Sequence, residues 1–199
     1  MVQNPARRAA LTDAAIDVLA REGARGLTFR AVDAQAGVPG GTASNYYASR
    51  DDLLHQTARR IHHRLTPDPA VLTDLLRAPR DRALVTALML NLMSRIGDDR
   101  AGYLAMLELR LEATRRPELR AELTETIRAD LEANVAYHLG EGLPGDRETV
   151  VVLYLAMTGL IVEHLTLPDV LGPDAVGALV DAIVERIVPD GLRRAGNGP

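Results

Sequence analysis

The sequence predicts an all-α protein with an N-terminal helix-turn-helix head of three helices and a C-terminal helical bundle, about nine helices in all. Three observations favour this class. Apolar residues recur at helical spacing along almost the whole chain, and no stretch alternates with period two for long enough to indicate a strand. Glycines, prolines and capping residues separate the helical stretches. With 199 residues, 47% of them hydrophobic, the chain can bury a sizeable core.

Four short helices are predicted in the first 65 residues. Gly23 ends the first, and the second begins after its cap Thr28 and ends at Gly37. Ser49 followed by Asp52 resembles a capping box, with Asp in place of Glu, and opens the fourth helix. The predicted ranges are 8–22, 28–36, 41–47 and 49–65.

The sequence TPDP at 66–69 is the first strong break, and we place the boundary between head and body there. The predicted domains are a head at 1–48, a connecting helix at 49–65, a body at 66–190 and a disordered tail at 191–199. Body helices are predicted at 72–76, 80–96, 101–114, 118–139, 147–167 and 174–188.

Charge and composition limit the classes of function that the protein can have. Residues 1–64 contain nine arginines and six acids, whereas the rest contains 14 arginines and 21 acids, so a basic head is joined to an acidic body. The absence of cysteine excludes disulfides and thiolate chemistry. The longest apolar run, Val150 to Val162, is shorter than the roughly 20 residues needed to cross a bilayer. We therefore expect a buried helix there, no membrane contact and, without a secretory signal, a cytoplasmic protein.

Residues 28–47 fit a helix-turn-helix, whose second helix enters the major groove of duplex DNA. That helix has short polar side chains that can read base edges. Of its two tyrosines, Tyr46 is expected on a phosphate, while one ring packs inward. Gly41 is expected to bring the free N–H groups of the helix N-terminus close to a phosphate. The predicted DNA-binding residues are Thr28, Arg30, Gly41, Thr42, Ser44, Asn45, Tyr46, Tyr47 and Arg50.

Residues 8–54 resemble the DNA-binding head of the TetR family of bacterial one-component repressors. The resemblance implies an Ω-shaped homodimer, a variable C-terminal ligand-binding bundle, and repression that a small molecule releases. Pro39 and Gly40 replace the hydroxyl cap and lysine usual in the family, and Ser44 stands where tyrosine is common, which suggests a particular operator preference. The matching motifs are Gly26-Leu27-Thr28-Phe29, Ala36-Gly37-Val38, Gly41-Thr42, Tyr46-Tyr47, and Ser49 with Arg50 ahead of Leu53.

The body is expected to supply a dimer interface and an effector pocket. The last predicted helix has a wide apolar stripe, and two such helices from each of two chains would form a four-helix bundle. Methionines and scattered polar residues in the other helices indicate a pocket for a hydrophobic or amphipathic effector. The predicted interface residues are Val176, Leu179, Val180, Ile183, Val184 and Ile187, and the predicted ligand-binding residues are Met89, Met93, Tyr103, Met106, Tyr154, Met157 and Thr158.

Sequence motifs of other function classes are missing or weak. No Glu-x-x-His pair, Gly-x-Ser-x-Gly elbow or phosphate-binding loop occurs, so we expect neither an enzyme nor a cofactor. His62 and His63 are adjacent and cannot converge on one metal ion from a helix, so no metal site is expected. Arg7 and Arg8 are either an arm for the minor groove or an ordinary frayed terminus. The remaining alternative is a small-molecule-binding bundle or adaptor whose DNA-binding head is degenerate.

Overall fold

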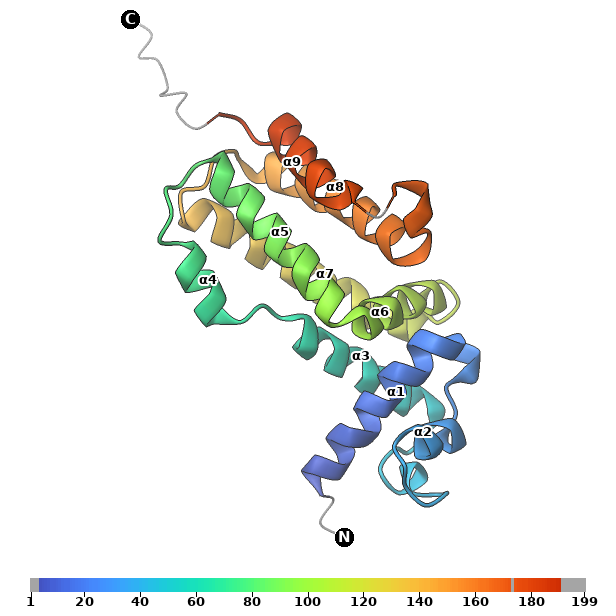
Figure 1. Cartoon of the computed structure of the whole chain (residues 1–199). Helices are drawn as coiled ribbons and strands as arrows, with labels where there is room; N and C mark the ends of the chain where they lie inside the picture. The colour runs from blue at the N-terminus through green and yellow to red at the C-terminus, as the bar shows by residue number, and fades with distance from the viewer. Residues whose placement is uncertain (1–3, 173, 191–199) are drawn as a thin grey trace, which may run out of the picture. The chain divides into compact units, whose positions relative to one another are not determined.

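The computed structural model describes residues 4–172 and 174–190, so the predicted tail at 191–199 lies outside the described residues. The all-α prediction is confirmed: the described residues form helices and turns without a strand (Figure 1). The chain divides into two compact units. Among the described residues, unit 1 comprises 4–66 and 99–125, and unit 2 comprises 67–98, 126–172 and 174–190. These units differ from a simple division at residue 66, because residues 99–125 cluster with the head.

Unit 1 is built around α1, which packs against α2, α3 and α6. Its buried face is the apolar face that the sequence predicts, including Leu11, Ile16 and Leu19, all fully buried. Gly23 has non-helical dihedral angles with φ of 68°, so the regular helix stops there as predicted. The elements are α1 (Pro5–Gly26), α2 (Phe29–Gln35), the 3₁₀ turn η1 (Ala43–Asn45), α3 (Arg50–Leu65), α6 (Arg100–Ala113) and the start of α7 (Pro117–Gly140).

The first turn of α1 is a well-capped helix start. The Asn4 side chain accepts hydrogen bonds from the backbone N–H groups of Ala6 and Arg7, at 3.0 and 3.2 Å. Pro5 occupies the first helical position, where its missing N–H costs nothing. Arg7 and Arg8 are therefore helical residues, which corrects the frayed terminus considered for them; their contact with the minor groove stays a prediction.

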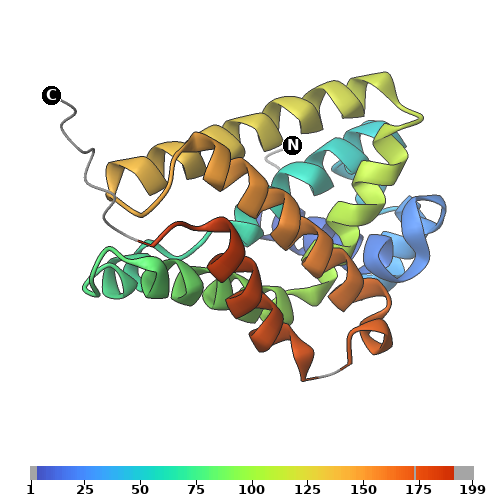
Figure 2. The same cartoon turned by 90° about the horizontal axis from the view of Figure 1, so that it is seen from above.

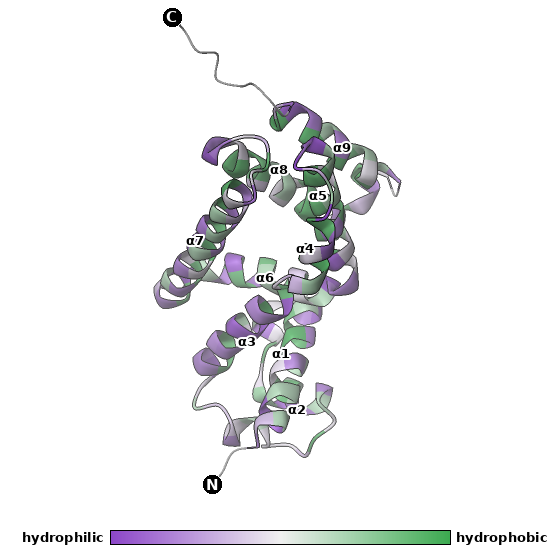
Figure 3. Ribbon diagram, turned by 90° about the vertical axis from the view of Figure 1, so that its left-hand side faces the viewer, coloured by the Kyte–Doolittle hydropathy of each residue, from purple (hydrophilic) through white to green (hydrophobic). Residues whose placement is uncertain are grey.

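Unit 2 is a layer of apolar helices. The α9 helix packs on α5 and α8, and Figure 2 shows α8 and α9 side by side. Hydrophobic residues dominate α5, α8 and α9, whereas α3 is mainly hydrophilic (Figure 3). The Asp146 side chain caps α8 and forms a reciprocal capping box with Thr149. The elements are α4 (Pro69–Leu75), α5 (Arg82–Asp98), the rest of α7, α8 (Arg147–Thr166), the 3₁₀ turn η2 (Pro168–Val170) and α9 (Ala175–Ile187).

By length and composition alone, α8 could cross a membrane, and within the described ranges no other helix passes that test. The core helix of a soluble protein passes it too. Here Leu153, Met157 and Leu160 of α8 are buried, and the helix packs on α5 and α9. Only 28% of the apolar window of α8 is buried, so the expectation of a buried helix holds only in part: the helix packs within unit 2 while Val152 and Leu155 stay exposed.

The apolar stripe of α9 divides between two environments. Val180 and Val184 are completely buried within the chain, where α9 meets α5 and α8. The prediction that these two valines lie in a dimer interface is therefore corrected. A side chain that its own chain already surrounds has no surface left for a partner. Partly exposed stripe residues are Val176, Leu179, Ile183 and Ile187, and Val152 and Leu155 of α8 are exposed apolar residues of the same unit.

Candidate DNA-binding site

A buried carboxylate organises the turn that follows α2. Asp33 is only 2% exposed, and its two oxygens accept the backbone N–H groups of Gly41 and Ala43, each at 2.7 Å. Hydrogen bonds to an ionised acceptor are short and strong, and here they replace the solvation that burial removes from the carboxylate. Asp33 thus holds the start of the recognition segment, residues 41–47, against α2.

The prediction that the N-terminus of the recognition segment offers free N–H groups to a phosphate is therefore wrong for Gly41 and Ala43. Their N–H groups are already donated to Asp33. Gly41 has a different function: its φ is +89°, a conformation that residues with a Cβ rarely adopt. The glycine allows the chain to turn sharply enough to reach the carboxylate.

The predicted third helix at 41–47 is much shorter in the structure. Regular helical structure is limited to η1, three residues long. Its backbone bonds run mainly from residue i+3 to residue i, as from Asn45 to Thr42 and from Tyr46 to Ala43. The hydroxyl of Ser44 and the amide of Asn45 both donate to the Gly41 carbonyl, and such local bonds compete with a regular helix.

The predicted base-reading side chains lie at the surface of this turn. Ser44 and Asn45 are exposed and Thr42 is partly exposed. In the structure the Thr42 hydroxyl donates to the Pro39 carbonyl at 2.5 Å, while the Ser44 hydroxyl and the Asn45 amide donate to the Gly41 carbonyl. To read a base edge, these groups would exchange weak exposed bonds within the turn for bonds to DNA.

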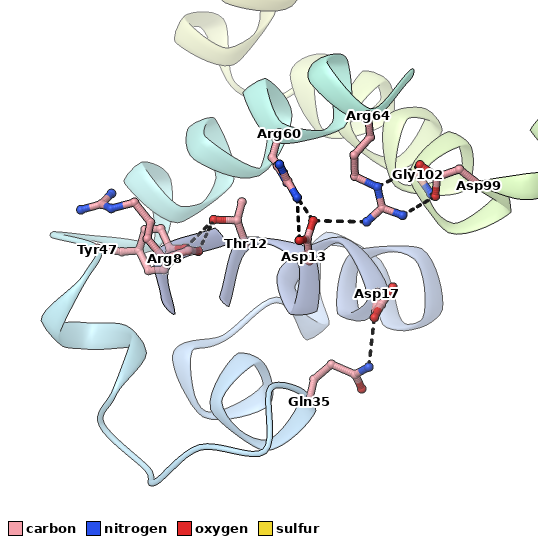
Figure 4. Close-up of polar contacts among 10 residues, drawn as sticks. All are labelled: Arg8, Thr12, Asp13, Asp17, Gln35, Tyr47, Arg60, Arg64, Asp99 and Gly102. Atoms are coloured by element: carbon pink, nitrogen blue, oxygen red, sulfur yellow. Dashed lines mark hydrogen bonds and ion pairs between the residues drawn. The ribbon is translucent and has the colours of Figure 1, made fainter. Parts of the chain in front are cut away.

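The two adjacent tyrosines differ in burial. Tyr47 is 2% exposed, and its hydroxyl lies 2.7 Å from that of the buried Thr12 in α1 (Figure 4). Burial raises the pKa of the Tyr47 hydroxyl above its ordinary value, so the group stays neutral. Tyr46 is only half-buried. Tyr47 is therefore the ring that packs inward, and a role for it in DNA binding would be indirect.

The two arginines predicted near the DNA backbone are placed differently. The guanidinium of Arg50 donates to the carbonyls of Leu27, at 3.0 Å, and of Ala24. The expectation that Arg50 supplies charge to a phosphate is therefore corrected: it braces the end of α1, whose last carbonyls need donors. Arg30 is exposed on α2, and Thr28 caps that helix by accepting the Ala31 N–H at 3.1 Å, as predicted.

Sequence reasoning missed Asp33 and Arg8. Asp33 stands beside the inward-facing Val32, eight residues before Gly41. An acid on the buried side of a short helix just before a glycine turn was the available signal. Arg8 was considered only as part of a minor-groove arm or of a frayed terminus, and nothing local in the sequence indicates the side chains that it contacts.

An ion-pair cluster joins α1, α3 and α6 within unit 1 (Figure 4). Arg60 makes two hydrogen bonds of 2.8 Å to Asp13, and Arg64 contacts Asp13 at 3.4 Å and Asp99 at 2.5 Å. Asp99 also caps α6 by accepting the Gly102 N–H at 3.0 Å. The Arg60 hydrogen bond lowers the pKa of the Asp13 carboxyl below its ordinary value, although burial opposes the shift.

We expect the stability that Asp13 contributes to be lost in acid. Because its folded-state pKa is below the ordinary 3.8, the contribution is complete above about pH 5 and declines as the pH falls toward about 2. The free energy of unfolding in urea is measured from neutral to acid pH for the wild type and for Asp13→Asn. The two values should differ at neutral pH and converge in acid. A constant difference would show that Asp13 does not titrate in this way.

The predicted ligand-binding residues fall on both units. In unit 2, Met93 and Met157 are buried on α5 and α8, which contact each other. The Thr158 hydroxyl donates to the Tyr154 carbonyl at 2.7 Å. Met89 and Tyr154 are partly exposed in unit 2, and the remaining two, Tyr103 and Met106, are on α6 in unit 1. Over the described ranges, no group of three or more metal-ligating residues occurs.

Two family models match the chain. The model for bacterial regulatory proteins of the tetR family matches residues 11–57, and the model for the tetracyclin repressor-like C-terminal domain matches residues 80–190. The first covers most of α1, all of α2 and η1, and the start of α3, and the second covers α5 to α9. Together they cover most of the described elements.

Three curated sequence relatives are transcriptional regulators, in agreement with the family models. The transcriptional regulator BetI of Agrobacterium fabrum is 28% identical over 194 residues, 95% of this chain and 93% of that protein. BetI of Rhizobium meliloti is 34% identical over 85 residues, 43% of this chain and 41% of that protein. The nicotine-responsive repressor HdnoR of Paenarthrobacter nicotinovorans is 23% identical over 188 residues, 91% of this chain and 95% of that protein.

Two solved structures share the fold along nearly the whole chain. The multidrug binding protein EbrR in complex with imidazole is 29% identical, with a TM-score of 0.68 over 96% of this chain and 99% of that chain. A TetR-family member from Streptomyces coelicolor A3 is 28% identical, with a TM-score of 0.69 over 93% and 99%. Both family models, the curated relatives and the solved structures agree, so the chain belongs to the TetR family of DNA-binding transcriptional regulators.

Proposed function

We propose that this regulator is a cytoplasmic repressor that binds a palindromic operator as a homodimer and leaves it when a small hydrophobic or amphipathic molecule binds. The main support for DNA binding is the recognition segment. Asp33 holds this segment in place, and the segment presents Ser44 and Asn45 at the surface. A short, rigid, polar turn of this kind suits the major groove, because its small side chains allow close approach.

The body supports the ligand-responsive part of the proposal. Apolar residues dominate α5, α8 and α9 of unit 2, and methionines on α5 and α8 can adapt to ligands of different shape. The similar protein EbrR has been solved with ethidium and with proflavin. Release would follow from a population shift, in which the effector binds better to an arrangement that does not fit the operator.

The partly exposed apolar residues of α8 and α9 support the homodimer. Leu155 is 61% exposed and Val152 42% exposed, and on α9 the residues Val176, Leu179, Ile183 and Ile187 keep part of their surface. Exposed apolar residues on adjacent helices are the kind of surface that self-association covers. Burying them against the same helices of a second copy would complete a four-helix bundle.

The function is tested by selecting the purified protein against random duplex DNA at moderate salt and sequencing what is retained. An enriched palindrome, with half-sites about one helical turn or 34–36 Å apart, would support both the head and the dimer. If a folded protein enriches no sequence at low or moderate salt, the alternative of a ligand-binding bundle with a degenerate head gains support.

Two substitutions should separate positioning from sequence reading. Removing the Tyr46 hydroxyl in Tyr46→Phe should weaken binding to all sequences about equally, because a phosphate contact has no sequence content. Asn45→Ala should instead relax the preference at one base of the half-site, by about 1–3 kcal/mol of discrimination. Repeating the selection with each variant checks both, and two wild-type profiles would show that these contacts are wrongly assigned.

A further inference from the structure

Arg8 lies where three elements of unit 1 meet. Its guanidinium carbon is 5.9 Å from the centre of the Tyr46 ring and 5.6 Å from that of Tyr47, both within the range of a cation–π contact. Its Nη1 donates to the Gln56 side chain at 2.6 Å. Its own carbonyl accepts the hydroxyl of Thr12 at 2.8 Å and that of Tyr47 at 3.3 Å. One residue of α1 thus contacts the end of the recognition segment and α3.

The contact with Gln56 continues to the start of α3. Gln56 donates its amide to Asp52 at 2.8 Å, and the second oxygen of Asp52 accepts the Ala48 N–H at 2.9 Å. The Gln56 hydrogen bond lowers the pKa of the Asp52 carboxyl, so this acceptor stays ionised near neutral pH. The Arg8 guanidinium is therefore held by hydrogen bonds that run through Gln56 and Asp52 to the backbone of Ala48, the residue after Tyr47.

Tyr46 needs such a neighbour more than Tyr47 does. The Tyr47 ring is buried and its hydroxyl is bonded to α1, so packing alone determines its orientation. Tyr46 is half-buried and follows a turn of only three helical residues. A cation placed over its ring restricts the ring to one orientation, which lowers the entropy lost when its hydroxyl meets a fixed acceptor.

We propose that Arg8 is a positioning residue for DNA binding: its guanidinium, anchored on Gln56, orients the Tyr46 ring so that the tyrosine hydroxyl meets an operator phosphate. The inference rests on the proposed function, in which Tyr46 makes that contact. Arg8 acts through Tyr46, and the energetic consequence of removing Arg8 depends on whether the Tyr46 hydroxyl is present.

The test is a double-mutant cycle on operator affinity, with the selected palindrome as the probe. Arg8→Gln should weaken binding about threefold to fivefold more than Arg7→Gln, which removes the same charge from the neighbouring exposed position. In the Tyr46→Phe background, Arg8→Gln should weaken binding no more than Arg7→Gln does. Gln56→Ala, which leaves α1 unchanged, should weaken binding in the wild-type background and not in Tyr46→Phe.

The salt dependence of binding gives a second readout. If Arg8 only positions Tyr46, Arg8→Gln and Arg7→Gln should have the same slope of log affinity against log salt concentration. Loss of a direct phosphate contact would instead reduce the magnitude of that slope by about one. Additive effects of Arg8→Gln and Tyr46→Phe, or a slope lowered by Arg8→Gln alone, would overturn the inference and leave the proposed function intact. If the wild type selects no operator, the proposed function fails, and this inference fails with it. Urea unfolding of each variant identifies any affinity loss caused by unfolding.

Discussion

Replacing Asp33 with alanine should disorder the recognition segment and abolish most specific DNA binding. The substitution leaves the N–H groups of Gly41 and Ala43 without their acceptor, and Ala43 is fully buried. Losing charge-assisted bonds to a buried partner costs about 2–3 kcal/mol of the free energy of unfolding. We expect operator affinity to fall at least about tenfold, because binding would then have to order the segment. Urea unfolding and titration of the selected operator measure the two effects.

Two further variants make this result interpretable. Asp33→Asn keeps one carbonyl oxygen but turns an amide NH₂ toward the other backbone donor, so its loss of stability should fall between wild type and Asp33→Ala. Asp17→Ala removes an acid whose bond to Gln35, at 3.2 Å, lies at the surface, and should cost about 0.5 kcal/mol or less. If Asp33→Ala destabilised the protein no more than Asp17→Ala, the buried carboxylate would not be what holds the segment.

Gly41→Ala should destabilise the protein by about 1–2 kcal/mol through backbone strain alone. A Cβ at Gly41 would meet nothing within 4 Å, so the cost comes from the φ of +89° and not from a clash. Relaxing that angle would also move the Gly41 N–H away from Asp33. The free energy of unfolding in urea measures the strain, and operator titration shows whether binding falls with it.

The adjacent Gly40 is the matched control. A Cβ there also finds open space, and its φ lies outside the positive range. Gly40→Ala should therefore be neutral or stabilise the protein by about 0.4–1 kcal/mol, because alanine restricts the unfolded chain. Equal effects at both positions would rule out backbone strain at Gly41. A loss of DNA affinity at Gly41 well beyond the loss of stability would mean that the Cβ itself obstructs the groove.

Most helices were predictable because their signals are local. Thr28 and Ser49 cap the helices that follow them, as predicted, since each side chain bonds an N–H only three residues ahead. Gly23 and Gly37 end helices with positive φ for the same kind of local reason. The recognition segment was predicted too long because its helical pattern competes with side-chain bonds to Gly41, which periodicity does not describe.

The orientation of side chains within an element was less predictable. On α9 the stripe from Val176 to Ile187 is apolar throughout, and hydropathy alone does not separate the residues that the chain buries from those left at its surface. Only packing on α5 and α8 shows that Val180 and Val184 are internal. Similarly, charge indicated Arg50 as a phosphate contact, but the end of α1 provides carbonyls for it.

Local patterns in the sequence were enough for the helical class, for the helix caps Thr28 and Ser49 and, through the spacing from Gly26 to Ser49, for the DNA-binding family. These properties depend on groups a few residues apart, so the chain specifies them without a partner. Only the tertiary structure decided that Asp33 holds Gly41 and Ala43, that Tyr47 turns inward to Thr12, and that Arg8 lies over Tyr46. Arg8 and Tyr46 are 38 positions apart in the sequence, and the hydrogen bonds of Asp33 and Tyr47 are strong because they are buried. Neither this proximity nor this burial exists until the helices pack against one another.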